Sequence, residues 1–454
     1  MNICPRDRWR ASLKSGLQRW IERLLAPVSA SAVIGGFVVG AVPGAYAAGV
    51  PVPAAPPSNA AVSAVLYDPV TGQVLYDQHD LMHMFPASTT KLMTALLVAM
   101  HDHHMSRKIT ITAGEAAVGG SSSPMAAGER LTLRNLLYGL LLVSGNDAAV
   151  TLARATAGSV PRFVAMMNAE AKALGAPGTH FANPDGLPNP AHYTTALGLA
   201  RIAAADLRQP EVMRVLHTQV VEHYPLPTGS TAPMVNQDQL LWNYPGIIGG
   251  KIGYTPEAGN TMVAIARRHG TTLIAVVLHD VPWQLFQDEA NLLNYGFARY
   301  RTVSLVLPGA VVARLTVRGE AHRLIPVVTT GSLRWDVVRG SAVHTMTRAL
   351  LPHVLRPGEA RGHEVGTLVV ELGGRVVGRV PLALGQRVPA LPPPPPPALP
   401  RELELLGAFL GAALVARRVQ VVRRRRVLGT ALRRRRRYRL RRSPGRLRSA
   451  GGRM

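Results

Sequence analysis

The chain contains a single cysteine, Cys4, among its 454 residues. One thiol cannot form a disulfide within the chain, and Cys4 lies in an N-terminal segment that we expect to be removed. The mature protein is therefore predicted to have no disulfide bond and no thiol chemistry. Cys4 also precedes the apolar part of that segment, which is not the position of a lipid-modified cysteine.

Acidic residues are scarce as well, with 26 Asp and Glu against 51 Lys and Arg, which gives a net charge of +25. Residues 417–454 contain 17 Arg and no acidic residue, and residues 1–47 add a net +4, so only +4 is left for residues 48–416. Because the central part is nearly neutral, we expect no nucleic-acid partner. An Arg-rich arm for nucleic acid would require the C-terminal end to lie in the cytoplasm.

Residues 1–47 have the pattern of an export signal. Six basic residues precede an uncharged stretch that begins at Leu24. The pair Pro43-Gly44 then precedes Ala-Tyr-Ala at residues 45–47, which has the small-x-small form that signal peptidases recognise. An uncleaved anchor helix is the alternative. We predict that the chain is exported.

The C-terminal part lacks an apolar run of the usual spanning length. The run at residues 405–416 has 12 residues, whereas a helix usually needs about 17 to 25 to cross a bilayer. It could be a short span, extended by the valines that follow, with the Arg cluster on the cytoplasmic side. It could instead lie in the membrane interface, held by the basic tail against anionic lipid. Both alternatives predict membrane attachment.

Between these ends the apolar pattern predicts strands, then helices, then strands again. Residues 64–67 and 74–76 flank a turn and predict a hairpin, and a largely helical stretch follows from about 131 to 207. Residues 261–266 and 272–278 predict two further strands. This order predicts an α+β or α/β domain, in which helices pack on a mainly antiparallel sheet that mixes both ends of the domain.

The residue pattern of the sequence changes near residue 305. Short β-like runs at 311–317, 324–328 and 368–372 alternate with Gly-rich turns, which predicts a small all-β domain. Residues 392–397 are all proline, which is typical of a stiff spacer.

Ser88 and Lys91 are the first candidates for chemistry. They lie three residues apart where a helical pattern begins, so they share one face of that helix. A neutral lysine amine can take the proton of a serine hydroxyl and make it a nucleophile, provided that its pKa is lowered from about 10.4. Backbone N–H groups at the helix start would face the developing oxyanion. Alone, the Ser-x-x-Lys pattern is weak evidence for a catalytic pair, and a serine that caps the helix is the alternative.

Two later segments could complete such a site. Ser144 and Asn146 flank a glycine between two helices, where a hydroxyl and an amide can relay a proton and bind a peptide carbonyl. The alternative is an interhelical turn with a capping residue. Lys251 lies between glycines just before the strand pair, so a substrate backbone could approach it closely and meet a positive charge.

The order Ser-x-x-Lys, Ser-x-Asn, Lys-x-Gly resembles the active-site triplet of penicillin-recognising serine enzymes. Within them the chain resembles the low-molecular-weight D-alanyl-D-alanine carboxypeptidases, peptidase family S11. Residues 181–188 (FANPDGLP), 192–196 (HYTTA) and 254–259 (YTPEAG) support this placement, as do residues 236–242. The resemblance is strong over about residues 58–300. It implies a penicillin-binding/β-lactamase-like transpeptidase domain.

The resemblance implies a role for each candidate residue. Ser88 would attack the carbonyl between two D-alanines, Lys91 would be the base, and water would release the acyl group. Ser144 would pass the proton to the leaving amine, and Asn146 would hold the substrate amide. Lys251 would attract the terminal carboxylate. The remaining substrate-binding residues would be Gly253, Tyr254 and Thr255. The N–H groups of Tyr254 and Ser88 would form the oxyanion hole. No cofactor or metal is implied.

Ile252 departs from the family pattern, which has Thr or Ser there. That hydroxyl helps to bind the substrate carboxylate, so its loss removes a charge-assisted hydrogen bond worth about 1.5 to 3 kcal/mol. Acylation is expected to survive while carboxylate recognition shifts, and Thr255 could compensate. A D,D-endopeptidase, a β-lactamase-like enzyme and a catalytically weak wall-binding homologue are the alternatives, although no Glu-x-x-x-Asn loop of a β-lactamase occurs between residues 146 and 236.

These expectations give one organisation for the chain. The partners implied are the D-Ala-D-Ala terminus of the peptidoglycan stem peptide, β-lactam antibiotics and the membrane. The location implied is the extracytoplasmic face of the bacterial cell membrane. The expected segments are a signal peptide (1–47), a linker (48–60), the serine peptidase domain (61–304), the small β domain (305–388), a Pro-rich linker (389–400), a membrane-anchoring segment (401–422) and an Arg-rich tail (423–454).

Overall fold

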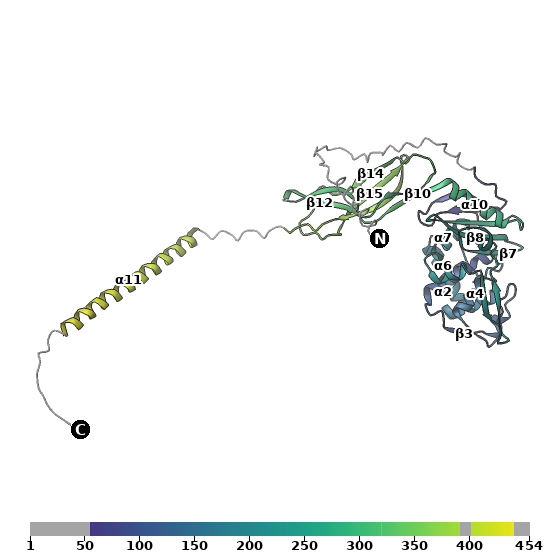
Figure 1. Cartoon of the computed structure of the whole chain (residues 1–454), viewed down its shortest axis with the longest axis horizontal. Helices are drawn as coiled ribbons and strands as arrows, with labels where there is room; N and C mark the ends of the chain where they lie inside the picture. The colour runs from purple at the N-terminus through teal and green to yellow at the C-terminus, as the bar shows by residue number, and fades with distance from the viewer. Residues whose placement is uncertain (1–54, 319, 391–400, 440–454) are drawn as a thin grey trace, which may run out of the picture.

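The computed structural model describes residues 55–318, 320–390 and 401–439 (Figure 1). The predicted signal peptide with Cys4 and the proline run at 392–397 lie outside these residues, as does the end of the Arg-rich tail.

A five-stranded antiparallel sheet forms the centre of the first domain, in the order β2-β1-β9-β8-β7. Strand β1 lies between β2 and β9, so the sheet joins the two ends of this domain as the sequence predicts. Strand β7 is at one edge, where it pairs with β8 only among the described residues. The strands are β1 (Ser63–Tyr67), β2 (Val74–Gln78), β7 (Ile247–Thr255), β8 (Gly259–Arg268) and β9 (Thr271–Asp280).

Helices cover both faces of this sheet, because its strands alternate two apolar sets of side chains. In β1, Val65 and Tyr67 belong to the larger core, with the helical region, while Ala64 and Leu66 belong to a second core with α10. Figure 1 shows α10 on the side of the sheet opposite α2 and α4. The helical elements are η1 (Ala87–Thr90), α2 (Lys91–His101), α3 (Ala113–Ala116), α4 (Leu133–Leu141), α5 (Asn146–Ala157), α6 (Val160–Ala173), α7 (Ala196–Asp206), α8 (Pro210–Leu216), α9 (Leu240–Asn243) and α10 (Leu285–Arg299).

The helical stretch expected from 131 to 207 is interrupted. Residues 175–195 form turns and isolated bridges instead of a helix. Gly175 and Gly178 have φ values of 63° and 53°, which no right-handed helix accommodates, and four prolines follow between 177 and 190. This segment passes beside the start of α2, which brings it to the candidate site.

Two short ribbons were not expected. They pair β3 with β4 and β5 with β6, and they lie among the helices on the larger-core side of the sheet. Their ranges are β3 (Lys108–Thr110), β4 (Arg130–Thr132), β5 (Val220–Pro225) and β6 (Thr231–Val235).

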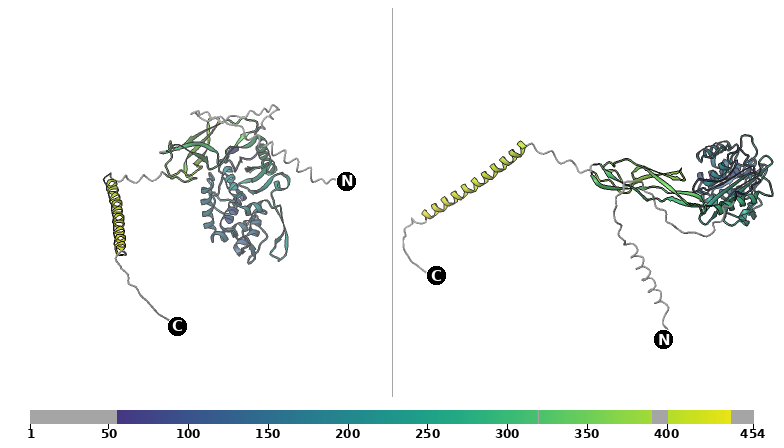
Figure 2. Two further views of the ribbon diagram at one scale, coloured as in Figure 1. Left: turned by 60° about the vertical axis from the view of Figure 1, so that its left-hand side comes forward. Right: turned by 90° about the horizontal axis from the view of Figure 1, so that it is seen from above.

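After α10 the elements are strands up to residue 384, as the β-like runs predict. Strand β10 begins at Tyr300, before the expected boundary at 305, because α10 ends at Arg299 and the chain continues extended. A five-stranded sheet and the β10-β13 pair make up this part of the chain, drawn in green in Figure 2. They enclose a third core that includes Val327 and Leu382. The strands are β10 (Tyr300–Val306), β11 (Val311–Val317), β12 (Glu320–Thr329), β13 (Leu333–Val338), β14 (Thr345–Leu350), β15 (Glu364–Leu372) and β16 (Arg375–Leu384).

The turn of the β1-β2 hairpin contacts β13. The Asp336 carboxylate accepts hydrogen bonds from Thr71 Oγ1 at 2.6 Å and from Thr302 Oγ1 at 2.8 Å. The Asp336 N–H donates to the side chain of Gln73 at 2.5 Å. The Tyr300 hydroxyl donates to the Leu75 carbonyl at 3.0 Å. The central sheet is thus bonded directly to the strands that follow α10.

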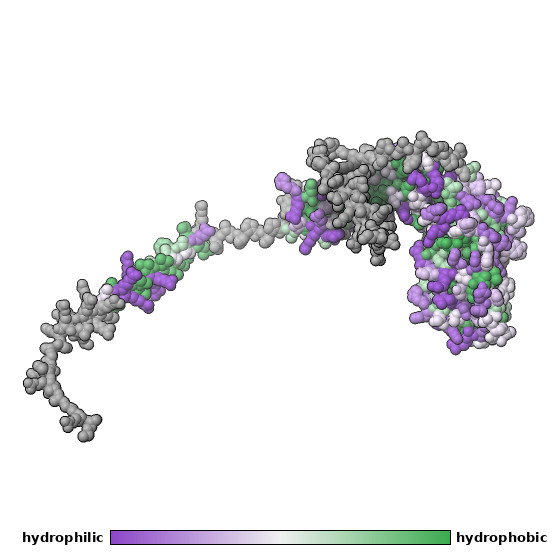
Figure 3. All heavy atoms as spheres, in the orientation of Figure 1, coloured by the Kyte–Doolittle hydropathy of each residue, from purple (hydrophilic) through white to green (hydrophobic). Residues whose placement is uncertain are grey.

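Helix α11 (Arg401–Arg439) is longer than the segment predicted at 401–422. It continues through the Arg cluster because Arg is a good helix former. Its part from Glu402 to Thr430 is long and apolar enough to cross a membrane by length and composition. The apolar side chains of residues 403–428 are uncovered (Figure 3).

Candidate active site

Ser88 lies in η1, directly before α2, and Lys91 is the first residue of α2. The Lys91 ammonium donates to Ser88 Oγ at 2.8 Å. Lys91 is completely buried, whereas Ser88 is half-buried and so remains open to a ligand. A neutral amine in this position would accept the proton of Ser88 along the same line.

Two further acceptors hold the Lys91 side chain in place. Its Nζ donates to Asn146 Oδ1 at 2.7 Å and to the Asp185 carbonyl at 2.6 Å. Burial and, to a smaller extent, the positive charge of Lys251 together lower the pKa of Lys91 to about 7. A lysine with a pKa near 7 is partly neutral at physiological pH, as a general base must be.

Ser144 and Asn146 lie at the junction of α4 and α5. Ser144 is nearly buried and has a φ of 64°, a conformation that costs a residue with a Cβ about 1 kcal/mol or more. The Asn146 amide donates to the Gly119 carbonyl at 2.9 Å, which orients its oxygen toward Lys91. Asp147 braces the same loop by accepting from Ser122 Oγ at 2.6 Å. The turn that presents Asn146 is therefore fixed from both sides.

Strand β7 brings Lys251 and Gly253 to the site. A Cβ on Gly253 would lie 2.7 Å from the Ser88 backbone nitrogen and 2.6 Å from Thr261 Oγ1, so only glycine permits this approach. Thr261 Oγ1 donates to the Pro86 carbonyl at 3.0 Å and fixes the start of η1 against the sheet.

Lys251 is buried and its Nζ donates to the Ile252 carbonyl at 2.8 Å. Burial lowers the pKa of Lys251 to about 7, while the negative charge of Asp238 acts in the opposite direction. Burial in turn raises the pKa of Asp238 to about 6. Asp238 is the nearest source of compensating charge that acts on Lys251, and its carboxylate lies against Gly250.

The other residues predicted on β7 face different surroundings. Ile252 is half-buried and packs against the core on the α10 side of the sheet. Tyr254 is 63% exposed. Thr255 Oγ1 accepts from the Ala258 N–H at 3.1 Å, in the turn between β7 and β8.

Comparison with known proteins identifies the family. The sequence profile of the D-alanyl-D-alanine carboxypeptidases, peptidase family S11, matches residues 51–281. The chain belongs to this family. It is a serine hydrolase of the D-alanyl-D-alanine carboxypeptidase class.

The matches extend over most of the length of each relative. The carboxypeptidase DacF of Bacillus subtilis is 31% identical over 332 residues, which is 72% of this chain and 85% of DacF. DacB2 of Mycobacterium tuberculosis is 36% identical, over 56% of this chain and 86% of DacB2. The crystal structure of penicillin-binding protein 5 from Haemophilus influenzae superposes with a TM-score of 0.66 at 26% identity, over 74% of this chain and 99% of that one. The carboxypeptidase described here therefore has a fold of the penicillin-binding protein 5 type.

Hydrogen bonds join three of the predicted residues of this carboxypeptidase, namely Ser88, Lys91 and Asn146. Lys251 acts on Lys91 through its charge, and Gly253 meets Ser88 through the backbone. In the part of the chain that the structure describes, the side chains of Ser144, Tyr254 and Thr255 make no hydrogen bond to Ser88 or Lys91.

The sequence motifs indicate no role for Asp185 or Asp238. Asp185 acts through its backbone carbonyl, which every residue has, so the identity of the residue could not indicate this role. The acidic side chain of Asp238 could have indicated a charge partner for a lysine, but only the folded chain places it near Lys251.

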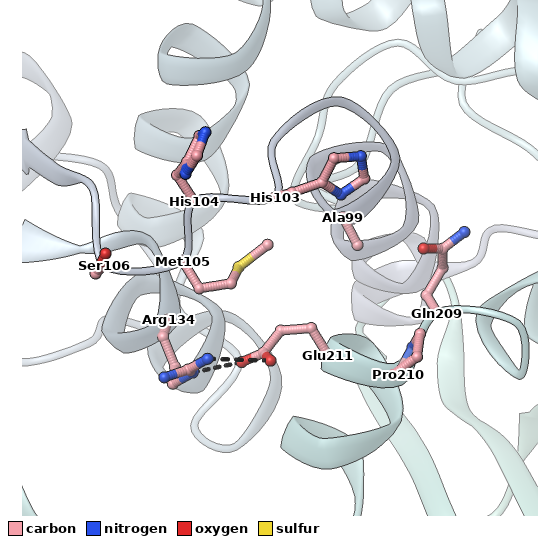
Figure 4. Close-up of a pocket in the computed structure, with 9 residues that line it drawn as sticks. All are labelled: Ala99, His103, His104, Met105, Ser106, Arg134, Gln209, Pro210 and Glu211. Atoms are coloured by element: carbon pink, nitrogen blue, oxygen red, sulfur yellow. Dashed lines mark hydrogen bonds and ion pairs between the residues drawn. The ribbon is translucent and has the colours of Figure 1, made fainter.

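A second hollow lies at the far end of α2 from Ser88. It has a volume of about 450 Å³ and is lined by His103 and His104 (Figure 4). Its wall also contains the ion pair between Arg134 and Glu211. The exposed histidines follow the end of α2. This hollow has no residue in common with the Ser88 site.

Proposed function

We propose that the chain is an exported carboxypeptidase that removes the terminal D-alanine from peptidoglycan stem pentapeptides through an acyl-enzyme on Ser88. Its role would be cell-wall biogenesis and remodelling, and β-lactams would acylate the same serine. The observation that carries this proposal is the buried Lys91, held 2.8 Å from Ser88 Oγ and 2.7 Å from Asn146.

The reaction follows from these positions. Neutral Lys91 takes the proton of Ser88 Oγ as the oxygen bonds to the penultimate D-alanine carbonyl. The N–H groups of Ser88 and Tyr254 stabilise the oxyanion. The C–N bond then breaks, and the proton reaches the departing D-alanine amine through Ser144. Water attacks the ester and Lys91 accepts its proton. The C–O bond to Ser88 then breaks, Lys91 returns the proton to Ser88 Oγ, and the tetrapeptide leaves.

Binding of the substrate uses the remaining groups. Asn146 and the exposed edge of β7 would hold the peptide backbone, which can add to the sheet as a further strand. Lys251, with Gly253 and Thr255 beside it, would attract the terminal carboxylate. No step requires a metal or a cofactor.

Mass spectrometry of the chain incubated with benzylpenicillin tests the acyl-enzyme. We expect a covalent adduct on the peptide that contains Ser88, no adduct in Ser88→Ala, and an unchanged adduct in the control Ser332→Ala, which alters an exposed turn. Fast hydrolysis of penicillin without a lasting adduct would favour the β-lactamase alternative. The absence of both adduct and turnover would favour a wall-binding role.

Ile252 is the position at which substrate preference is tested. We expect Ile252→Thr to raise kcat/KM on a D-Ala-D-Ala stem peptide about 10- to 100-fold, because a hydrogen bond to the carboxylate contributes about 1.5 to 3 kcal/mol. Ile252→Val is the matched control, since it has the shape of Thr without the hydroxyl. Equal rates for Thr and Val would show that Ile252 does not limit carboxylate recognition. Cleavage of cross-linked peptides by the unaltered chain would support endopeptidase activity.

Membrane attachment by α11 completes the proposal. The helix is long and apolar enough to span by composition, and a tether would keep the exported domain near its substrate.

A further inference from the structure

Largely exposed aromatic side chains are few in the folded part of this carboxypeptidase. Among the described residues before α11 they are Trp242 at 49%, Tyr254 at 63% and Trp283 at 79% exposed. Single exposed aliphatic side chains are ordinary, but an indole has a large apolar surface that is usually covered at least in part. The exposure of Trp283 is therefore typical of a surface that binds a ligand or a partner.

Trp283 and Tyr254 lie at the same corner of the central sheet. Tyr254 pairs with Asn260 on β8, and Asn260 pairs with Asp280 at the end of β9. The Asn260 amide donates to the Asp280 carbonyl at 3.2 Å, which joins the two strands at this level. Two strand spacings, about 10 Å, separate Tyr254 from Asp280 across the sheet. Trp283 follows three residues after Asp280, in the turn that leads into α10.

Both residues belong to the α10 side of the sheet. Ile252 packs against the core on that side. Tyr254 is two residues further along β7 and has its side chain on the same face, because the side chains of a strand alternate. The turn with Trp283 leads into the helix that covers this face, and Phe286 in the first turn of α10 packs against the same core. Tyr254 and Trp283 therefore form one surface beside Ser88, which we call the aromatic corner.

The proposed mode of substrate binding leads from Ser88 toward the aromatic corner. The terminal carboxylate would lie near Lys251, and the attacked carbonyl would lie at the N–H of Tyr254. The peptide then runs antiparallel to β7, and its amino-terminal part continues past Thr255. The three residues that precede D-Ala-D-Ala in a stem pentapeptide extend about 10 Å. That length matches two strand spacings, so the sugar attached to the amino end of the peptide can reach Trp283.

The polar groups around the aromatic corner fit an uncharged sugar. Residues 254–262 and 279–291 contain four acidic residues and no Lys or Arg, which disfavours anionic lipid headgroups and nucleic acid. Gln284 and Gln287 are exposed in the same segment, and their amides can donate to and accept from hydroxyl and acetamido groups. A pyranose ring has a face of C–H groups, and packing that face on an indole removes apolar surface from water.

We propose that Tyr254 and Trp283 form a subsite for an amino sugar of the glycan strand, next to the stem peptide that docks at Ser88. The choice of a sugar rests on the proposed function, because a wall substrate has a sugar beyond the amino end of its peptide. Trp283 packs against the sugar ring, and Gln284 hydrogen-bonds to its substituents. Stem peptides that are still attached to sugar are then better substrates than free peptides, while the chemistry at Ser88 is the same for both.

A matched pair of substrates tests the subsite with the full chain. These are the free stem pentapeptide and the disaccharide pentapeptide, in which the same peptide carries two amino sugars. We expect kcat/KM for release of D-alanine to be about tenfold higher with the disaccharide, through a lower KM, since the sugar is bound equally before and during the reaction. Trp283→Ala should remove this preference, and Trp283→Phe, which keeps a ring, should retain most of it. A preference that persists in Trp283→Ala, or that the unaltered chain lacks, would overturn the subsite.

Trp242→Ala is the control for the loss of an exposed indole. Trp242 lies in α9, and the Tyr244 carbonyl that follows this helix accepts from the Ile247 N–H at 3.3 Å, at the start of β7. Tyr254 is seven residues further along that strand, a distance of about 23 Å. Trp242→Ala should therefore keep the preference for the disaccharide. Equal loss of the preference in Trp242→Ala and Trp283→Ala would overturn the subsite.

Two further measurements on the same samples separate the alternatives. The penicillin adduct on Ser88 reports the proposed function, and its absence together with no release of D-alanine from either substrate would contradict that function. Equal rates on the two substrates with the adduct retained would contradict the subsite alone. Sedimentation at increasing protein concentration tests self-association, and a dimer that Trp283→Ala abolishes would assign the aromatic corner to a second copy of the chain and overturn the subsite.

Discussion

Two buried lysines lie at the candidate active site, and the proposed mechanism needs each in a different protonation state. In that mechanism Lys91 is neutral when it accepts the proton of Ser88, and Lys251 is charged when it attracts a carboxylate. Burial lowers the pKa of each to about 7, and for Lys91 the positive charge of Lys251 contributes to this shift. Their titrations are therefore linked, and the active form has one proton on the pair.

The pH dependence of kcat/KM on a stem peptide follows from this pair. Lys91 loses its proton as the pH rises through about 7, which raises the rate. Lys251 loses its charge over a similar range, which lowers it. We expect a bell-shaped profile centred near neutral pH, measured by release of D-alanine.

Lys251→Arg is the discriminating variant, because a guanidinium stays charged at all accessible pH values. The alkaline limb of the profile should disappear and the acidic limb should remain. An alkaline limb unchanged in Lys251→Arg would contradict the assignment of that limb to Lys251.

The sequence motifs indicated the residues that meet around Ser88 better than the residues that hold them in place. The spacing of Ser88 and Lys91 places them on one helix face, and the order of the motifs indicated Asn146 and Lys251. Asp185 could not be predicted, because its contribution is a backbone carbonyl at the end of an irregular segment. The role of Asp238 depends on burial, which a single acidic residue in a sequence does not reveal.

At the scale of elements, the contact between η1 and β7 sets the reacting geometry. Gly253 is the point of closest approach, since a Cβ there would lie 2.7 Å from the Ser88 nitrogen. We expect Gly253→Ala to lower the rate of acylation by labelled penicillin about 100-fold, because a shift of about 1 Å at a reacting centre has that effect.

The matched control for Gly253→Ala is Gly114→Ala, where an added Cβ meets nothing within 4 Å. It should acylate at the original rate. Thermal melting of both variants shows whether the fold is kept. A normal acylation rate in Gly253→Ala would show that β7 has room to move away from Ser88.

Elements with a clear apolar periodicity were predicted well. Elements that glycine and proline interrupt, or that form only by pairing in the folded chain, were not. The β1-β2 hairpin and strands β8 and β9 follow their apolar runs. The break in the helical region at 175–195 was missed, because glycines and prolines override the apolar spacing there. The anchoring segment was predicted at 401–422, where the apolar pattern lies, and the helix that contains it continues to Arg439 because the Arg-rich sequence keeps helical propensity.

At the scale of the whole molecule, Asp68 and Asp336 join the central sheet to the strands after α10. Burial raises the pKa of Asp68 to about 6, and the negative charge of Asp336 acts in the same direction. The folded chain therefore binds this proton more tightly than the unfolded chain does. The stabilising contribution is complete below about pH 4 and is lost as the pH rises through about 6.

Replacing Asp336 by Asn removes one charge of this pair and keeps an oxygen that can accept from Thr71 or Thr302. We expect Asp336→Asn to raise the melting temperature at pH 8 by about 1–2 °C, as about 1 kcal/mol does in a folded part of roughly 300 residues, and to leave it unchanged at pH 4. The exposed Glu364→Gln is the control and should change neither value. A gain of equal size at both pH values would contradict the repulsion.

In the proposed mode of binding, a peptide pairs with the edge of β7 beside Ser88, and the enzyme would then not distinguish most side chains of its substrate. Main-chain hydrogen bonds are the same for every amino acid, so a peptide that docks as an extra strand is recognised without regard to most of its side chains. Selection is then left to the two ends of the docked segment, the carboxylate near Lys251 and the small residue at the bond that is cut. Bacteria that vary the middle of their stem peptides would present equivalent substrates to this strand edge.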